Sequence, residues 1–144
     1  MVSIRAKNQA VFRACLVKAW HPRLIDVYLW ISEHTDMTPV ITSAYRPGGG
    51  VHGTDPLRAV DLRSRGLTDP MGIAAAINLN WHYGDDRHEV CVYHQIVTCS
   101  KCGERHSCRE HIPPCPNCGN THGISDGLHF HIQVRNETES VTCL

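Results

Sequence analysis

The stretch GLHFHIQV, residues 127–134, carries two histidines in a pattern that could do chemistry. It predicts a β-strand, because apolar and β-branched residues follow a loop rich in Gly, Asn and Ser. Alternate side chains of a strand share a face, so His129 and His131 should lie on one side. Phe130 and Ile132 should then face the core. Two imidazoles on one rigid strand suit a metal ion and a catalytic partner, although a surface or packed pair is equally compatible with this motif alone.

Asp61 lies in the middle of residues 58–63, a segment that alternates as a strand. A carboxylate inside an apolar strand is costly to bury unless it is paired or binds a metal ion. Asp61 is therefore either a metal ligand or half of a salt bridge. The candidate partners for a salt bridge are Arg46, Arg58 and Arg63.

His52, Asp61 and His131 offer two imidazoles and one carboxylate from separate elements. Three protein ligands leave the fourth position of zinc to water, which is the pattern of a catalytic site. A zinc ion there would lower the pKa of water towards about 7 and polarise a scissile carbonyl. His129 would then act as general base and later as proton donor. Arg46 could stabilise the oxyanion of the tetrahedral intermediate.

Eight cysteines and eleven histidines indicate metal binding rather than disulfides. Two C-x-x-C-G segments stand at residues 99–103 and 115–119, with twelve residues between the second and third of their four cysteines. Four thiolates complete a tetrahedral shell with no open position, so this pattern predicts a structural zinc site that resembles a zinc ribbon. The predicted ligands are Cys99, Cys102, Cys115 and Cys118.

Other interpretations of these cysteines stay open. A redox dithiol would need only one pair, and the same four thiolates could bind iron. Residues 98–122 are expected to form a small stabilising or substrate-gripping lobe, inserted into a single domain that spans residues 1–144. His106, Cys108 and His111 could substitute as ligands, while Cys15, Cys91 and Cys143 are expected as buried or terminal free thiols.

The elements that must position these residues are helices over 5–19, from Pro22 to about residue 31, and over 70–81. Strands are expected at 39–43, 58–63, 89–97 and 127–134, and the third should be central because both of its faces are apolar. The predicted fold class is α+β, with helices packed on one side of a small antiparallel sheet. His94 could support the site or simply be packed, and His21 and His34 are expected as surface or capping residues at helix ends.

The composition of the chain limits the classes of function that it can have. A chain of 144 residues with 42% hydrophobic and 19% charged residues is enough for one globular domain. Fourteen basic and fourteen acidic residues cancel, which argues against a general nucleic-acid binder. Residues 44–50 form a glycine-rich turn without G-K-[ST], so no nucleotide site is expected. We see no signal peptide and no apolar run of about 18 residues, so we expect a soluble protein made in the cytoplasm with reduced cysteines.

The order of three motifs is familiar: S-A-Y-R-P at 43–47, H-G-T followed by R-A-V-D-L between 52 and 62, and H-F-H at 129–131. It resembles the zinc D-Ala-D-Ala peptidases, which include phage endolysins and belong to the hedgehog/DD-peptidase fold group. The resemblance implies zinc ligation by His52, Asp61 and His131, with Arg46 as transition-state stabiliser. Two features depart from the family. The spacing here is H-x8-D rather than H-x6-D, and no Glu precedes the last His by three residues, so the H-x-H strand is closer to the penicillin-insensitive murein endopeptidases.

The resemblance implies zinc-dependent hydrolysis of a peptide bond in bacterial cell-wall peptide, by a D-Ala-D-Ala carboxypeptidase or endopeptidase. The expected cofactors are one catalytic and one structural Zn²⁺. We expect a monomeric phage or prophage lysis enzyme that acts on peptidoglycan after release, with no nucleic-acid or membrane partner. The alternative is a non-catalytic zinc-binding adaptor that recognises a protein or nucleic-acid partner through its four-cysteine lobe.

Overall fold

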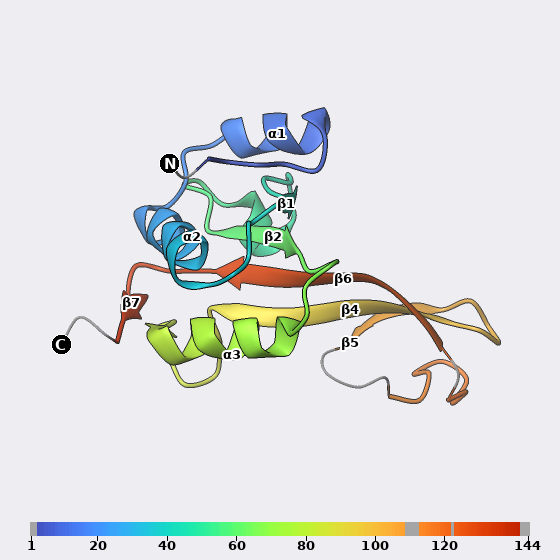
Figure 1. Ribbon diagram of the computed structural model, residues 1–144. Coiled ribbons are helices and arrows are strands. Elements are labelled where there is room, and N and C mark those ends of the chain that lie inside the picture. The colour runs from blue at the N-terminus through green and yellow to red at the C-terminus, as the bar shows by residue number, and fades with distance from the viewer. Residues whose placement is uncertain (1–2, 109–112, 122, 142–144) are drawn as a thin grey trace.

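The computed structural model describes residues 3–108, 113–121 and 123–141. Within them, five antiparallel strands form one sheet in the order β1-β2-β6-β4-β5, accompanied by three α-helices (Figure 1). The predicted α+β class with a small antiparallel sheet is therefore confirmed. The helices are α1 (Gln9–Leu16), α2 (Pro22–His34) and α3 (Pro70–Asn80), and η1 (Gly50–Gly53) is a single 3-10 turn. The strands are β1 (Ile41–Ser43), β2 (Ala59–Arg63), β3 (Trp81–His82), β4 (Cys91–Cys99), β5 (Arg105–Cys108), β6 (Gly123–Gln133) and β7 (Glu139–Ser140).

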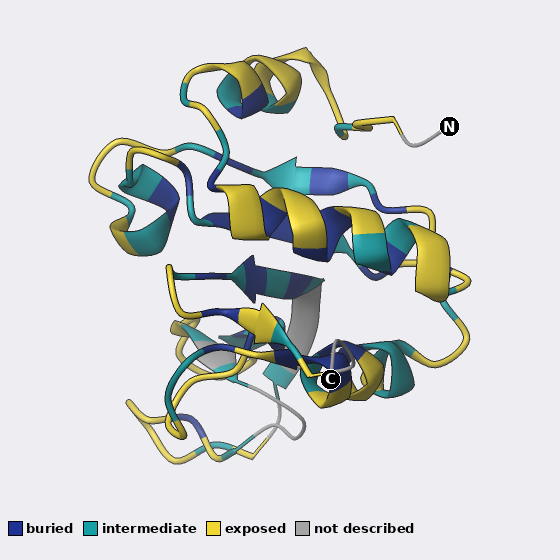
Figure 2. Ribbon diagram, turned by 90° about the vertical axis from the view of Figure 1, so that its left-hand side faces the viewer, coloured by how far each residue is buried: buried dark blue, intermediate teal, exposed yellow. Residues whose placement is uncertain are grey.

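The core lies between α2, α3 and one face of the sheet. Phe130 and Ile132 of β6 are fully buried there, as the alternation of the strand predicts. Val60 and Leu62 of β2 join the same cluster, which also takes apolar residues from both helices. Figure 2 shows α2 with buried and exposed residues alternating along it, as expected for a helix with one face on a sheet. The helical residues of this cluster are Leu24, Val27, Tyr28, Ile31, Ala74 and Ile77.

The opposite face of the sheet carries the polar residues of interest. The antiparallel register places Asp61 directly across from His131 and Arg63 across from His129. On the other side of β6, His94 of β4 lies across from His129. Strand β4 lies between β6 and β5, so its predicted position inside the sheet is confirmed. The register of three strands therefore assembles a polar cluster on one face.

Helix α1 begins four residues later than the sequence pattern predicts. The Asn8 side chain accepts a hydrogen bond from the Val11 N–H at 2.9 Å and so caps the helix at this point. The preceding residues run extended along β1, where the Ile41 N–H donates to the Arg5 carbonyl and the Lys7 N–H to the Ile41 carbonyl. A competing backbone partner therefore shortens the helix.

The other two helices begin where proline and a capping residue predict. Pro22 and Pro70 occupy the first turns of α2 and α3. His21 caps α2 by accepting the Arg23 N–H through Nδ1, which confirms its capping role, and Asp69 caps α3. None of the helices in the described part of the chain has both the length and the apolar character that crossing a bilayer requires.

Candidate metal centres

Three side chains converge on one point on the polar face. The Asp61 Oδ1 atom lies 3.0 Å from His131 Nδ1 and 3.3 Å from His52 Nε2, and the two nitrogens are 3.3 Å apart. His52 comes from η1, Asp61 from β2 and His131 from β6. The structure thus brings together the three ligands predicted from sequence.

These distances fit a zinc ion. Zinc–nitrogen and zinc–oxygen bonds of about 2.0–2.1 Å at tetrahedral angles put the ligand atoms about 3.3 Å apart. The three distances here, 3.0 to 3.3 Å, are of that size. The donor set is also one that zinc uses in open sites, with two imidazoles and one carboxylate.

The hydrogen bond behind His52 fixes which of its nitrogens faces the site. Its Nδ1 lies 3.0 Å from the Ala44 carbonyl oxygen, which can only accept, so Nδ1 carries the hydrogen and Nε2 offers a lone pair. The loop that holds the ring is tight, with the Arg46 N–H donating to the His52 carbonyl at 2.8 Å. A side chain at Gly53 would lie 2.8 Å from the Arg46 carbonyl oxygen, so this close approach requires glycine.

His131 is oriented in the same manner by a residue that sequence reasoning missed. The Gln133 Nε2 donates to the Glu89 carbonyl at 3.3 Å, which leaves Gln133 Oε1 to accept from His131 Nε2 at 3.2 Å. His131 Nδ1 therefore presents its lone pair to Asp61 and His52. A metal-binding histidine usually donates its other N–H to such a partner. The signal available in the sequence was position, since Gln133 lies two residues along the same strand face.

Lone pairs on three acceptor atoms at these distances repel one another unless a cation lies between them. Burial acts to raise the pKa of the Asp61 carboxyl, but its contacts with His131 and His52 lower that pKa well below its usual range. Asp61 is therefore an ionised carboxylate. Among the described residues its ion-pair partners are histidines and not arginines, so the salt-bridge alternative is not what the structure contains. A divalent cation, or a proton on one imidazole, satisfies this arrangement.

His129 lies beside the three ligands without joining them. Its Nε2 is 3.9 Å from Asp61 Oδ2, whereas His131 contacts the other carboxylate oxygen, Oδ1. The ring stacks on His94, with centroids 5.8 Å apart and planes 19° from parallel. His94 also meets His131 edge-on at 6.0 Å, so it supports the cluster rather than being packed elsewhere. His129 is 21% exposed in its side chain and is accessible from solvent.

Arg46 is exposed on the loop between β1 and η1. Its backbone is held next to His52, through the N–H bond to the His52 carbonyl described above and through an acceptor bond from the Gly49 N–H at 3.0 Å. Its role as oxyanion stabiliser stays a prediction.

The four predicted cysteines form the second candidate centre. The Cys99 and Cys118 sulfurs are 3.6 Å apart, and the Cys102 and Cys115 sulfurs are 3.7 Å apart. Zinc–sulfur bonds of about 2.3 Å in a tetrahedron give sulfur separations of about 3.8 Å. All four sulfurs lie within 4.8 Å of one another, so the group can hold a metal ion of the kind predicted.

Backbone and side-chain donors lower the pKa of two of these thiols. The backbone N–H of Cys102 is the main cause that lowers the pKa of Cys99, to about 6, and the Asn117 side chain lowers that of Cys102. For Cys118, the Asn120 N–H lowers the pKa, but burial and the neighbouring thiols outweigh it and raise the value to about 11. The four sulfurs cannot all ionise together without a cation, and a zinc ion supplies one.

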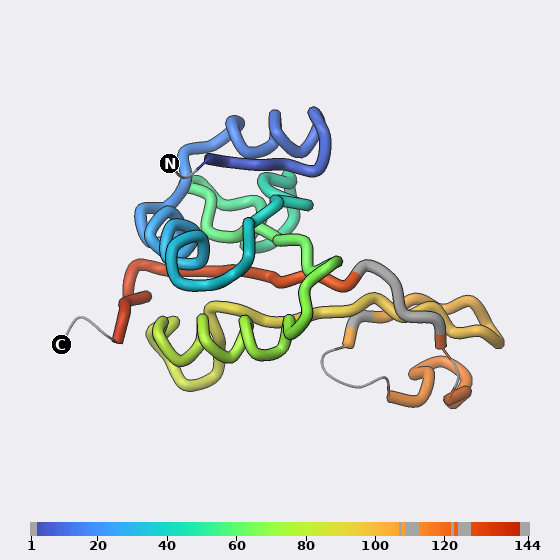
Figure 3. Tube along the Cα trace, viewed as in Figure 1, coloured from blue at the N-terminus to red at the C-terminus, as the bar shows by residue number. Residues whose placement is uncertain are grey.

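The other cysteines and histidines considered as ligands or free thiols lie in different parts of the structure. His106 and Cys108 lie on β5 and are outside the group that could hold the ion, so two C-x-x-C pairs suffice as predicted. Cys15 and Cys91 are buried free thiols, in agreement with expectation. His111 and Cys143 lie outside the described residues. Figure 3 shows the four-cysteine lobe at one end of the sheet, away from α1 and α2.

Comparison with known proteins adds no further assignment. No family model, curated protein or solved structure matches this chain.

Proposed function

We propose that this protein is a zinc-dependent peptidase that hydrolyses a peptide bond in bacterial cell-wall peptide. The observation that carries this proposal is the convergence of His52 Nε2, Asp61 Oδ1 and His131 Nδ1 within 3.3 Å of one another. All three atoms are lone-pair donors, and among the described residues they are the three that meet here, which leaves a position for a reacting molecule. A purely structural site would be closed, as the four-cysteine centre is.

Zinc at such a site polarises a carbonyl and makes water more acidic. The residues of the chain supply the rest. His129, beside Asp61 and exposed to solvent, takes a proton from the water that attacks the scissile carbonyl carbon and returns a proton to the departing amine. Arg46, fixed through its backbone beside His52, is the candidate that stabilises the negative charge developing on the carbonyl oxygen.

The choice of a cell-wall peptide rests on the order of the motifs, S-A-Y-R, H…D and H-F-H, which resembles that of zinc D-Ala-D-Ala peptidases. Within that proposal the enzyme is a carboxypeptidase or an endopeptidase of a phage or prophage, acting at the wall after release from the cell. A fold resemblance cannot fix the substrate, so the test must use the wall polymer itself.

The test is incubation of the zinc-loaded protein with purified peptidoglycan, with mass spectrometry of the released products. We expect wild type to release peptides or free D-amino acid, and Asp61→Asn to release neither. His129→Ala should be slower by roughly 10²–10⁴-fold, the range of a general base. His34→Ala is the matched control, because His34 is at the end of α2, the helix that packs on the other face of the sheet. If wild type releases nothing that the Asp61 and His129 variants do not, the peptidase proposal is wrong.

A second candidate is a zinc-binding adaptor that uses the four-cysteine lobe to recognise a partner. The position of that lobe, beyond the core cluster at the end of β4 and β6, favours it. A nucleic-acid partner has little electrostatic support, since residues 99–122 carry three basic and two acidic residues. An adaptor would keep its zinc and bind its partner in a His129→Ala variant, whereas a peptidase would lose activity.

A further inference from the structure

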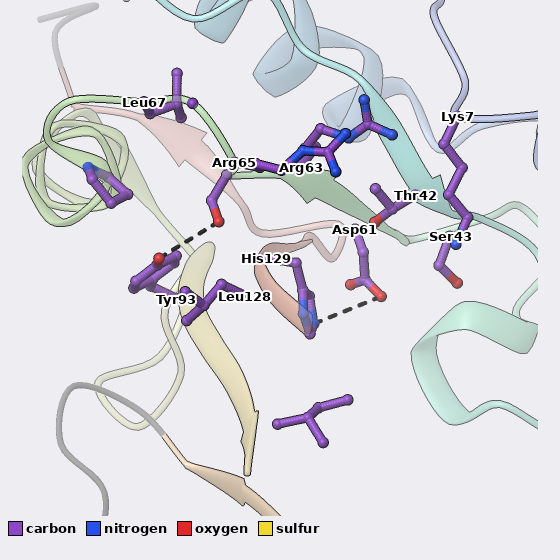
Figure 4. Close-up of a pocket in the computed structure, with 14 residues that line it drawn as sticks. Lys7, Thr42, Ser43, Asp61, Arg63, Arg65, Leu67, Tyr93, Leu128 and His129 are labelled. Atoms are coloured by element: carbon purple, nitrogen blue, oxygen red, sulfur yellow. Dashed lines mark hydrogen bonds and ion pairs between the residues drawn. The ribbon is translucent and has the colours of Figure 1, made fainter. Parts of the chain in front are cut away.

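A cleft of about 750 Å³ opens beside the candidate zinc site. Asp61 and His129 form part of its wall, so a molecule in the cleft lies next to the proposed reacting groups. Figure 4 shows Asp61 and His129 between two sides of the cleft, with Lys7 and Ser43 on one side and Tyr93 on the other. Leu128 lies on the Tyr93 side and Thr42 on the Lys7 side, while Arg63 and Arg65 lie above Asp61 and His129 in this view.

Three of the lining residues, Lys7, Arg63 and Arg65, are cations that pair with no carboxylate of the described residues. Asp61 is the single acidic residue in the described part of the lining. Some other basic residues of the chain do have such partners: Lys18 pairs with Asp55. Arg135 likewise pairs with Asp85 and Glu137, and Arg23 with Asp26.

The backbone positions of these three cations explain why all of them line the cleft beside the site. Lys7 is held by its N–H bond to the Ile41 carbonyl, which ties the extended segment before α1 to β1. Arg63 lies across from His129 in the β2–β6 register and follows Asp61 by two residues, on the same strand face. Arg65 follows in the turn after β2.

Like charges gathered in a cleft repel one another, and low-dielectric walls strengthen their combined field. Among the described lining residues the one carboxylate, Asp61, is already engaged by His131 and His52, and a zinc ion there would add two further positive charges. These described residues therefore include no carboxylate that pairs with the three cations. A ligand carboxylate would supply it, and the planar guanidinium of arginine binds a carboxylate through two parallel hydrogen bonds.

We propose that Lys7, Arg63 and Arg65 form a subsite for a carboxylate of the substrate. Two strand residues place the Arg63 backbone about 6.6 Å from that of Asp61. A peptide extends about 3.3–3.6 Å per residue, so a carboxylate one or two residues beyond the bond to be cut lies within reach of these side chains. The role of this subsite in cleavage rests on the proposed peptidase function. Binding of a carboxylate to the subsite can be measured separately.

The test is calorimetric titration of the zinc-loaded His129→Ala protein, which retains all three cations but should not consume the ligand. The probes are N-acetyl-D-Ala-D-Ala, its C-terminal amide, and N-acetyl-D-Glu-D-Ala amide, which carries only a side-chain carboxylate. We expect at least one of the acids to bind about tenfold or more tightly than the neutral amide. Which of the two acids is preferred tells whether the terminal or the side-chain carboxylate is recognised.

A second set of titrations assigns the preference to the cations. Arg63→Gln, added to the same background, should reduce the preference for the acid to about threefold or less. Arg87→Gln is the matched control, because Arg87 is exposed in the loop before β4 and does not line the cleft. A preference that survives Arg63→Gln unchanged would mean that the carboxylate binds elsewhere, for instance to the zinc ion, and would overturn the proposal.

Equal binding of acids and amide, or no binding of any probe, would also overturn it. Failure of this proposal and of the proposed function are distinguishable. Peptidoglycan cleavage without a preference for the acid leaves the peptidase and removes the subsite. A preference for the acid that depends on Arg63, without any cleavage, leaves the subsite and removes the peptidase.

Discussion

His52 and His131 use different ring nitrogens towards the same point, and their hydrogen-bond partners decide which. The Ala44 carbonyl takes the N–H of one ring, and Gln133 takes the N–H of the other. The candidate zinc site therefore depends on two groups that would not themselves touch the ion. Such partners set the orientation and basicity of metal-binding histidines.

Replacing Gln133 tests this dependence. In Gln133→Leu the His131 Nε2–H loses its acceptor, so we expect the affinity of this site for zinc to fall by about 10–100-fold. Gln133→Glu keeps an acceptor oxygen and should retain the affinity. The measurement is zinc competition with a fluorescent chelator, using a Cys118→Ser background in which the four-cysteine site is disrupted. Equal affinities for the Leu variant and wild type would contradict the role assigned to Gln133.

A pH dependence follows from the buried Cys15. Burial raises the pKa of its thiol above the ordinary value of 9.0 to about 11. Between these values the unfolded chain loses the proton and the folded chain keeps it, so the stability contribution is present below pH 9 and is lost as the pH rises towards 11. We expect the free energy of unfolding to fall more steeply over this range in wild type than in Cys15→Ala. Urea titrations of both proteins at pH 8, 9, 10 and 11 give the comparison, and parallel pH profiles would refute it.

At this scale, the sequence predicted the residue types that bind metal but not what orients them. Alternation on a strand was enough to place Asp61 and His131 on polar faces. Gln133 shares that face, but a lone amide side chain has no metal-ligand signature. The contribution of Ala44 is a backbone carbonyl, which any residue could supply, so no sequence pattern can reveal it.

Strand β6 places catalytic candidates and core residues on alternate positions. Phe130, between His129 and His131, is fully buried, whereas Leu128 is 43% exposed. The packing of one face thereby holds the histidines of the other face in register with β2 and β4. The same strand therefore contributes both to the stability of the core and to the geometry of the site.

Truncating Phe130 should therefore lower the stability of the fold and disturb the geometry of the site. Phe130→Ala removes a large, fully buried side chain, and we expect it to lower the free energy of unfolding by about 3–5 kcal/mol. Leu128→Ala, at an exposed neighbouring position, should cost less than about 1 kcal/mol. Urea denaturation followed by tryptophan fluorescence measures both. A Phe130 variant as stable as the Leu128 variant would show that β6 does not depend on this core contact.

Elements with a clear hydrophobic period were predictable, and short ones were not. The strands at 59–63 and 91–99 were anticipated within one or two residues. The two-residue strands β3 and β7, which pair with each other, are too short to show any period. The early part of the predicted first helix was lost to pairing with β1, a long-range contact that local propensity cannot contain.

At the scale of the whole molecule, each of the two candidate metal centres takes one ligand from the paired strands β4 and β6. Strand β4 ends at Cys99, and β6 carries His129 and His131. Each centre draws its ligands from a separate set of residues, so neither needs the other for its shell. The two should therefore bind zinc independently.

Counting zinc ions per chain by native mass spectrometry tests this independence. We expect two ions in wild type, and one each in His131→Ala and Cys118→Ser, because each substitution removes one ligand of one centre. Cys108→Ala is the control that should keep both, since Cys108 is not in the four-cysteine group. A single ion in wild type that persists in His131→Ala would remove the candidate catalytic centre and leave the structural one.

The four-cysteine lobe is inserted between the end of β4 and the start of β6. Cys99 and Gly123 are directly opposite each other where β4 and β6 meet it, and the two strands stay paired back to the histidine cluster, with one shift of register between His94 and Ile96. Residues in that relation are the ones that a two-residue Asn-Gly turn joins in an ordinary hairpin. The polar cluster and the lobe are thus separable modules of one hairpin. Because the shift of register lies between them, we expect that the four-cysteine segment could be exchanged for another recognition element without changing the pairing of His129 with His94.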